Sequence, residues 1–203
     1  MRKTLLPLVS ITLLVLASLA SPAIAAERTL TLDPTKTEVT FELGATGHDV
    51  HGVLHLDRGA IRFDTATGAA SGDVTINAGL TETGNAKRDK TMHKKVLESA
   101  TFPLMVFHAK SVEGELAPSG HSRITLGGTV SLVGKDHPLS FPADVEIANG
   151  SVAASATFPV PYVEWGVHNP STFILKVAKQ VQVSIAAKGT LEEAGTAATG
   201  SGR

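Results

Sequence analysis

Histidines are the residues of this chain best suited to bind a metal ion or to move a proton near neutral pH, and the sequence has eight of them. Three of these, His48, His51 and His55, lie close together. Glycines at positions 44, 47 and 52, and the apolar residues between the histidines, indicate a β-strand rather than a helix. On a strand, His51 and His55 share a face but lie ~13 Å apart, too far to bind one zinc ion at ~2.0–2.1 Å each. This group alone does not predict a metal site, and we expect no bound metal.

A metal or haem site would instead need histidines that distant segments bring together. His48, His93 and His108 are the residues that such a site would use. Metal or haem binding through them is kept as an alternative function.

A second polar group, Arg88 and Asp89, lies near the start of a predicted helix. The helix dipole favours a carboxylate there, and Asp89 can meet His93 one turn later. These residues could pair with neighbouring strands, which we favour, or contact the head group of a ligand. The candidate residues at the mouth of a binding site are His48, Arg88, Asp89, His93 and His108.

The sequence carries no signature of a catalytic nucleophile. It has no cysteine and no Gly-x-Ser-x-Gly turn, and its histidines match no catalytic motif. We expect that the protein is not an enzyme.

The elements that must position these residues are mostly predicted β-strands. Apolar and polar residues alternate in segments such as 37–43, 123–132 and 139–147, and Asn149-Gly150 is typical of a tight hairpin. About eight to ten such strands, each with one apolar face, predict an all-β fold, an antiparallel barrel of about eight strands. We also expect a hairpin turn at 57–59 and a last strand over 173–191.

One stretch breaks this alternation. From about 85 to 99, Ala86, Met92, Val96 and Leu97 recur with helical spacing, and lysines occupy most of the remaining positions. The pattern predicts one short α-helix. Its lysines form a solvated face, with attraction to anionic lipid surfaces as the weaker interpretation.

The two ends of the chain are predicted to lie outside the barrel. Arg2-Lys3, an apolar run over 5–20 and the small-residue site at 23–25 predict a secretory signal peptide over 1–25, because the run is short for a membrane anchor. Residues 192–203 are small and polar, and we expect a disordered tail. One domain over 26–191 is therefore expected in the periplasm, or outside the cell if the host lacks an outer membrane.

Composition gives no support for a nucleic-acid-binding protein and excludes one stabilised by disulfides. Without the signal peptide, 16 basic side chains stand against 19 acidic ones, which gives no reason to expect nucleic-acid binding. Without cysteines, stability must come from an apolar core rather than from disulfides.

Several segments, in order, resemble the YceI-like family of exported polyisoprenoid-binding proteins, which have a lipocalin-like barrel. The segments are DPTKTEVTF (33–41), GAIRFD (59–64), TGNAKRD (83–89), GTVSLVG (128–134) and WGVHNPSTFIL (165–175). The resemblance covers roughly residues 30–191. The chain departs from the family pattern at Asp136, where threonine is usual, and at 96–98, where Val-Leu-Glu replaces the usual Phe-Phe-Asp.

The resemblance implies an apolar barrel interior that takes an isoprenoid tail of the quinone or polyprenyl type, with no catalytic residues and no required cofactor. Such a tail has no hydrogen-bonding groups, so a dry aliphatic tunnel suffices to bind it. The candidate lining residues are Phe41, Leu43, Val74, Ile76, Phe107, Ile124, Leu126, Val130, Leu139, Phe141, Val145, Phe158, Leu175, Val183 and Ile185.

Two functions follow from the same fold. The first is transport or storage of an isoprenoid-tailed lipid, with transient membrane contact, by a monomer or homodimer. The second is a stress-related interaction module whose barrel is filled by its own side chains. Small inward residues can leave a cavity or pack tightly, so the sequence leaves both open.

Overall fold

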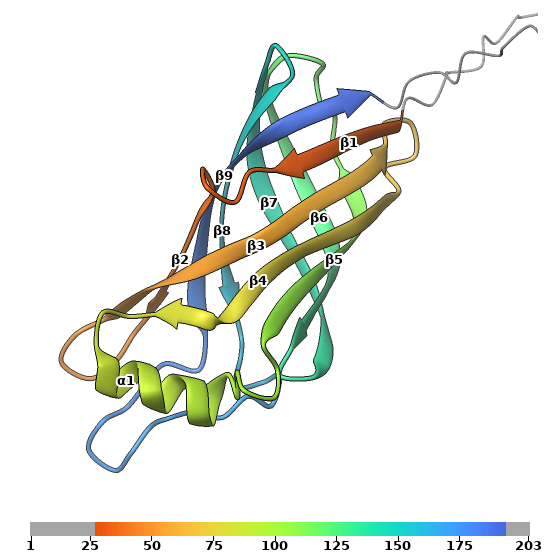
Figure 1. Ribbon diagram of the computed structural model, residues 1–203. Coiled ribbons are helices and arrows are strands. Elements are labelled where there is room, and N and C mark those ends of the chain that lie inside the picture. Colours follow the sequence, from red (N-terminus) through yellow and green to blue (C-terminus); the bar gives the residue numbers. More distant parts are fainter. Residues whose placement is uncertain (1–26, 194–203) are drawn as a thin grey trace, which may run out of the picture.

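A computed structural model describes residues 27–193, which fold into one closed antiparallel sheet with a short helix at one end (Figure 1). The strands are β1 (Glu27–Leu32), β2 (Glu38–Leu43), β3 (Val50–Asp64), β4 (Ala70–Glu82), β5 (Leu104–Glu113), β6 (Gly120–Leu132), β7 (Lys135–Ala148), β8 (Ser151–Val160) and β9 (Val181–Glu193). The α-helix α1 (Ala86–Thr91) continues as one π-helical segment, η1 (Met92–Val96).

The sheet closes into a barrel because β3 pairs with β4 and both β1 and β2 join β3 to β9. β1 and β2 follow one another along the same gap between β3 and β9, so the wall is eight strands around. The predicted all-β, lipocalin-like antiparallel barrel of about eight strands with one short helix is confirmed.

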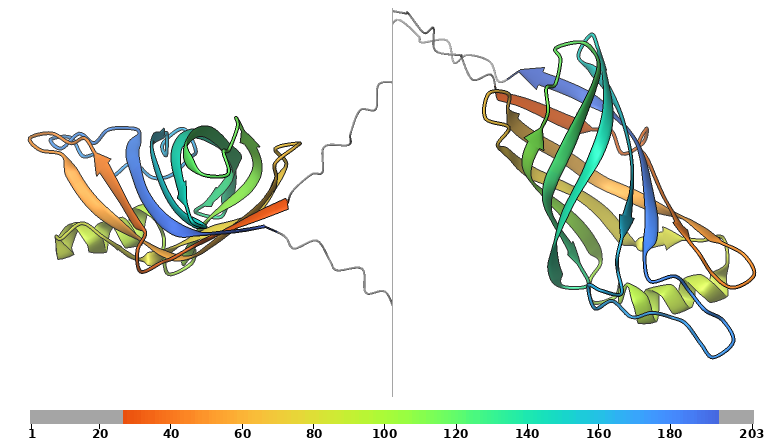
Figure 2. Two further views of the ribbon diagram at one scale, coloured as in Figure 1. Left: turned by 90° about the horizontal axis from the view of Figure 1, so that it is seen from above. Right: turned by 180° about the vertical axis from the view of Figure 1, so that it is seen from behind.

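The two ends of the barrel differ. We call the end that carries α1 and the loops over 44–49 and 161–180 the lower end, and the opposite end, where β1 begins and β9 finishes, the upper end (Figure 2). The helix begins where predicted because the Asn85 side chain accepts hydrogen bonds from the backbone N–H groups of Lys87 and Arg88. It ends at Val96, before Glu98 adopts a positive φ of 46°.

Three predicted boundaries are wrong. β3 runs unbroken through positions 57–59, where the register shifts between Leu56 and Arg58, so a β-bulge replaces the expected turn. The last strand begins at Val181 rather than at Phe173, because its partner strand β8 ends at Val160. Between Phe173 and Val181 only an isolated bridge forms, from Val177 to Ala45. β9 also runs to Glu193, two residues into the expected tail.

The expected signal peptide lies outside the described residues, as does most of the expected tail. None of the helices within residues 27–193 is long and apolar enough to cross a membrane.

Candidate ligand-binding site

Strand register places most of the predicted lining residues on the inner wall of the barrel. Val74 pairs with Phe107, Phe41 with Val183, and Phe158 with Val183, so these side chains share one face. Positions in the inward register are apolar or glycine along almost the whole wall. Polar exceptions lie near the two ends, among them Arg28 and Ser122 near the upper end and Thr81, Lys135 and His137 near the lower end.

Leu175 is the candidate that does not belong to this wall. It lies in the 161–180 loop outside the barrel and keeps 41% of its surface exposed. Its place in a segment without a strand partner explains the difference, and we leave it out of the proposed site.

Aromatic rings cross part of the interior. The rings of Phe141 and Phe158 stack with centroids 4.1 Å apart, and Phe107 packs against Phe141 at 5.7 Å. All three side chains are buried, in one cluster with Ile61 and Phe63. Phe107, Phe141 and Phe158 were predicted as lining residues, whereas Ile61 and Phe63 were not, although the alternation of GAIRFD could have identified them.

Two wall glycines let the rings of Phe41 and Phe107 lie close to the neighbouring strands. A β-carbon on Gly52 would come within 2.3 Å of the Phe41 ring, and one on Gly128 within 2.7 Å of the Phe107 ring. Each ring therefore occupies the space that a side chain would take on the neighbouring strand. This arrangement keeps both rings close to the wall.

The remaining lining candidates are only half-buried, although strands enclose them on both sides. They are Phe41, Leu43, Val74, Ile76, Ile124, Leu126, Val130, Leu139, Val183 and Ile185, whereas Phe107, Phe141, Val145 and Phe158 are buried. A tightly filled core would bury such inward side chains more completely.

The lower end is organised around Tyr162. Its hydroxyl donates to the carbonyl of Ala178 at 2.7 Å, and its ring packs with Leu132 and Val167. Burial raises the pKa of Tyr162 above its ordinary value, so the hydroxyl stays protonated and keeps this hydrogen bond. A pocket of about 220 Å³ lies beside this cluster, between Phe102 and Trp165.

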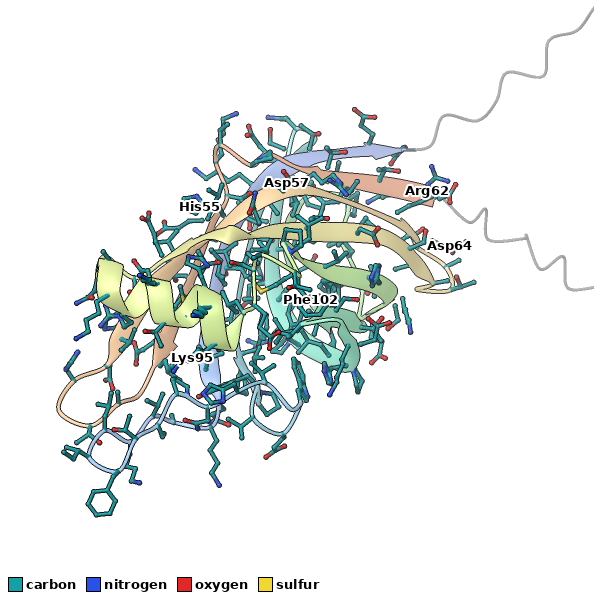
Figure 3. All side chains as sticks on the ribbon, turned by 60° about the horizontal axis from the view of Figure 1, so that its bottom comes forward. His55, Asp57, Arg62, Asp64, Lys95 and Phe102 are labelled. Atoms are coloured by element: carbon teal, nitrogen blue, oxygen red, sulfur yellow. The ribbon has the colours of Figure 1, made fainter. Side chains whose placement is uncertain are left out.

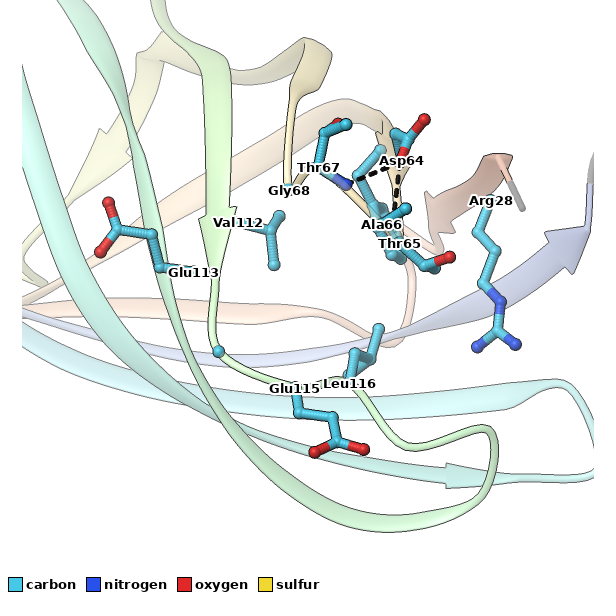
Figure 4. Close-up of a pocket in the computed structure, with 12 residues that line it drawn as sticks. Arg28, Asp64, Thr65, Ala66, Thr67, Gly68, Val112, Glu113, Glu115 and Leu116 are labelled. Carbon is cyan, nitrogen blue, oxygen red and sulfur yellow. Dashed lines mark hydrogen bonds between the residues drawn. The ribbon is translucent and has the colours of Figure 1, made fainter. Parts of the chain in front are cut away.

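A larger pocket of about 540 Å³ opens at the upper end, between the 64–68 turn and the 113–116 segment (Figure 4). Arg28 lines it with a side chain that is 12% exposed and pairs with Glu193 at 3.1 Å. Asp64, Glu113 and Glu115 also line the pocket. Three carboxylates against one guanidinium make it a poor site for an anionic head group. None of the predicted site residues lines either pocket.

Arg88 and Asp89 both bind Thr83 at the start of the helix. The Arg88 guanidinium donates to the Thr83 hydroxyl at 2.7 Å and to its carbonyl oxygen at 2.8 Å. The Asp89 carboxylate accepts from the Thr83 N–H at 3.0 Å and from its hydroxyl. These bonds join the end of β4 to the helix. No pattern in the sequence indicated the part played by Thr83.

The three histidines of the metal alternative are spread over the molecule. His48 is exposed in the 44–49 loop, His93 lies 3.0 Å from the Ser99 hydroxyl, and His108 contacts Asp73 at 2.6 Å on the outer wall. Residues 27–193 contain no group of three or more histidine, aspartate or glutamate side chains arranged to hold a metal ion.

Sequence comparison decides the family. A model of the YceI-like domain matches residues 30–189, which is nearly the whole of the barrel. The chain belongs to the YceI-like family. Among curated proteins, none matches this YceI-like chain.

Solved structures share the fold of this YceI-like domain at low sequence identity. BcnA of Burkholderia cenocepacia is 18% identical, with a TM-score of 0.63 over 78% of this chain and 99% of its own. A polyisoprenoid-binding domain from Saccharophagus degradans is 12% identical, with a TM-score of 0.60 over 80% and 98%. The YCEI protein of Campylobacter jejuni is 18% identical, with a TM-score of 0.52 over 68% and 80%. At these identities the likeness concerns the fold.

Proposed function

We propose that this YceI-like protein binds a lipid with an isoprenoid tail, such as a quinone or a polyprenyl compound, inside its barrel. The protein acts as a carrier or store and not as an enzyme, and it needs no cofactor. Family membership and the fold shared with a polyisoprenoid-binding domain support this function.

The observation that carries the proposal is the inner wall. Its inward positions are apolar or glycine except near the two ends, and ten of the predicted lining residues stay half-buried within a closed sheet. An isoprenoid tail offers no hydrogen bond, so it is matched by a wall that offers none. Each Å² of apolar surface that the tail buries stabilises the complex by ~25 cal/mol.

We place the tail in the lower part of the barrel. The stack of Phe141 and Phe158, with Phe107 beside it, limits how far a chain can extend toward the upper end. The same three rings are the observation that favours the second candidate, a barrel filled by its own side chains that serves as an interaction module.

Native mass spectrometry of protein purified from an exporting host, followed by lipid extraction, tests the proposal. A bound species with an isoprenoid fragmentation pattern is expected. A bare mass, together with no uptake of an added ubiquinone or polyprenol, would contradict the proposal and favour the filled barrel.

A pair of substitutions on one strand then locates the site. Val183→Trp places a large side chain on the inner wall, and we expect it to lower tail uptake at least tenfold. Gln182→Trp, the control, places the same side chain on the exposed outer face of β9. Equal uptake by the two variants, both folded by circular dichroism, would argue against a site inside the barrel.

We further propose that the protein is exported to the periplasm, in line with the signal peptide predicted over residues 1–25, and acts there as a monomer or homodimer. Fractionation of the native host, with detection of a mature form lacking residues 1–25, tests this localisation.

A further inference from the structure

We infer that the lower end of the barrel docks on an anionic membrane surface through a tight turn formed by residues 172–175. The inference goes beyond lipid-tail binding, because it concerns an outer surface of the protein.

The turn holds two large apolar side chains in water. Phe173 is 95% exposed and Ile174 is 85% exposed, the largest values among the exposed large hydrophobic residues of the described chain. At these exposures, neither Phe173 nor Ile174 packs against the barrel. Exposure of both costs free energy unless another surface covers them.

The turn is held in shape by hydrogen bonds on both sides of these residues. The Thr172 N–H donates to the Leu175 carbonyl at 2.7 Å, and the Leu175 N–H donates to the Thr172 hydroxyl at 3.0 Å. Phe173 and Ile174 therefore occupy the two central positions of a closed turn, which directs them away from its base.

The base of the turn is fixed to the barrel. Val177 forms a β-bridge with Ala45, and the N–H of Thr46 donates to the Lys176 carbonyl at 2.9 Å. The N–H of Lys176 in turn donates to the Thr46 hydroxyl at 3.0 Å. The apolar tip is thus displayed by a braced loop at the lower end (Figures 1 and 2).

The charge around this tip suits an anionic surface. Segments 44–49, 85–102 and 161–180, which form much of the lower end, carry seven basic and four acidic side chains, whereas the whole chain has a net charge of −1. Lys95 on the helix lies at this end (Figure 3). Lys176 and Lys179 follow the tip in the chain and are exposed, and neither takes part in an ion pair found within residues 27–193.

A bilayer fits this surface better than a protein partner does. A stable protein interface buries about 1,200–2,000 Å², far more than two side chains offer. A membrane interface, by contrast, accepts single aromatic and aliphatic side chains and attracts basic residues near anionic lipids, at about 1 kcal/mol for each lysine. Docking in this way would turn the lower end of the barrel toward the lipid.

Co-sedimentation of delipidated protein with vesicles tests the inference. One set of vesicles is phosphatidylcholine alone, and the other also contains roughly 30 mol% of the anionic lipid phosphatidylglycerol. We expect binding to the anionic vesicles that weakens as salt rises. Phe173→Ser with Ile174→Ser should weaken it at least tenfold, and Lys176→Glu with Lys179→Glu about tenfold. Lys110→Glu with Lys188→Glu, the control pair from exposed strand positions, should leave it within about twofold of the wild type.

Three results would overturn the inference. One is absence of wild-type binding to both vesicle types, and another is equal binding by the Phe173–Ile174 variant. In the third, analytical ultracentrifugation shows a dimer of the wild type that the Phe173–Ile174 variant does not form, and the wild type binds no vesicles. That result would assign the tip to a contact with a second copy of the chain. Tail uptake, measured without vesicles, is a separate readout, so failure of docking leaves the proposed function standing.

Discussion

The ring of Phe41 lies so close to Gly52 on the neighbouring strand that a β-carbon at position 52 would come within 2.3 Å of it. The carbonyl oxygen of Glu82 would lie only 2.7 Å from the same β-carbon. Only glycine therefore fits at position 52, because both the Phe41 ring and the Glu82 backbone leave no room for a β-carbon.

Replacement of this glycine should destabilise the barrel. For Gly52→Ala we expect a loss of about 1–3 kcal/mol in the free energy of unfolding, because the Phe41 ring and the strand must both shift. Gly44→Ala is the control, since its β-carbon would meet only ordinary contacts at 3.6 and 3.7 Å. Urea titration of both variants measures the difference, and equal midpoints would mean that the Phe41 ring moves without cost.

Removal of one ring of the aromatic stack should destabilise the fold and enlarge the space inside the barrel. Phe158→Ala is expected to cost about 3–5 kcal/mol, because it removes a buried ring stacked on Phe141 at 4.1 Å. If the ring limits the depth of the site, the variant should also gain affinity for longer polyprenols relative to shorter ones. Thr157→Ala, at an exposed position of β8, is the control. An unchanged preference for tail length would contradict the role of the ring as a limit.

The bonds between Thr83, Arg88 and Asp89 should act on folding rather than on the ligand. Arg88→Ala leaves two hydrogen bonds to Thr83 unmade and is expected to lower the free energy of unfolding by about 1–3 kcal/mol. Tail affinity should stay within about twofold, whereas a head-group contact would predict a larger loss. Lys90→Ala, on the exposed side of the helix, is the control, and a quinone titration with thermal melts separates the two roles.

Acid should weaken one corner of the barrel through Asp33. Hydrogen bonds from Lys36 and from the Thr35 hydroxyl and backbone N–H lower the pKa of Asp33 from 3.8 to about 2. The stabilisation is present above the unfolded-state pKa and disappears as pH falls through the folded-state pKa. The melting temperature of Asp33→Asn should therefore lie below that of the wild type at pH 6, and the gap should close between pH ~4 and ~2. A gap that persists at pH 2 would show that the carboxylate charge is not its cause.

The hydroxyl of Tyr162 should hold the lower end together. Tyr162→Phe keeps the buried ring but removes the 2.7 Å hydrogen bond to the Ala178 carbonyl, and we expect a cost of about 1 kcal/mol. Faster hydrogen exchange of the amides around Ala178 should accompany it. Unchanged exchange would mean that the ring alone fixes this loop.

Most of the barrel could be predicted because the inward residues repeat with a period of two. That repeat correctly placed the apolar face of β6, β7 and β8, and helical spacing from about 85 correctly placed the start of the helix. The same repeat misled at 173–180, where alternating residues form a loop because β8 ends at Val160 and only Val177 finds a bridge partner, Ala45. Alternation describes side chains, whereas a strand also needs a partner for its backbone.

The site was harder to predict for a related reason. A pattern identifies which side chains face inward, but not whether they meet across the barrel, as Phe141 and Phe158 do, or stay apart. Gly52 and Gly128 have no side chains, so nothing in their own identity indicated that rings cover them. The upper pocket depends on Arg28 meeting residues 64–68 and 113–116, which are distant in sequence.

The pairing of Arg28 with Glu193 places the first and last described strands side by side at the upper end (Figure 1). A fluorescent tag, an affinity handle or a sensor chip attached directly at Glu27 or Glu193 would therefore be held at the upper end, opposite the 172–175 turn. Protein immobilised in this way would present its lower pole to the solution, so that quinones, polyprenols and vesicles could all be offered to one uniformly oriented layer.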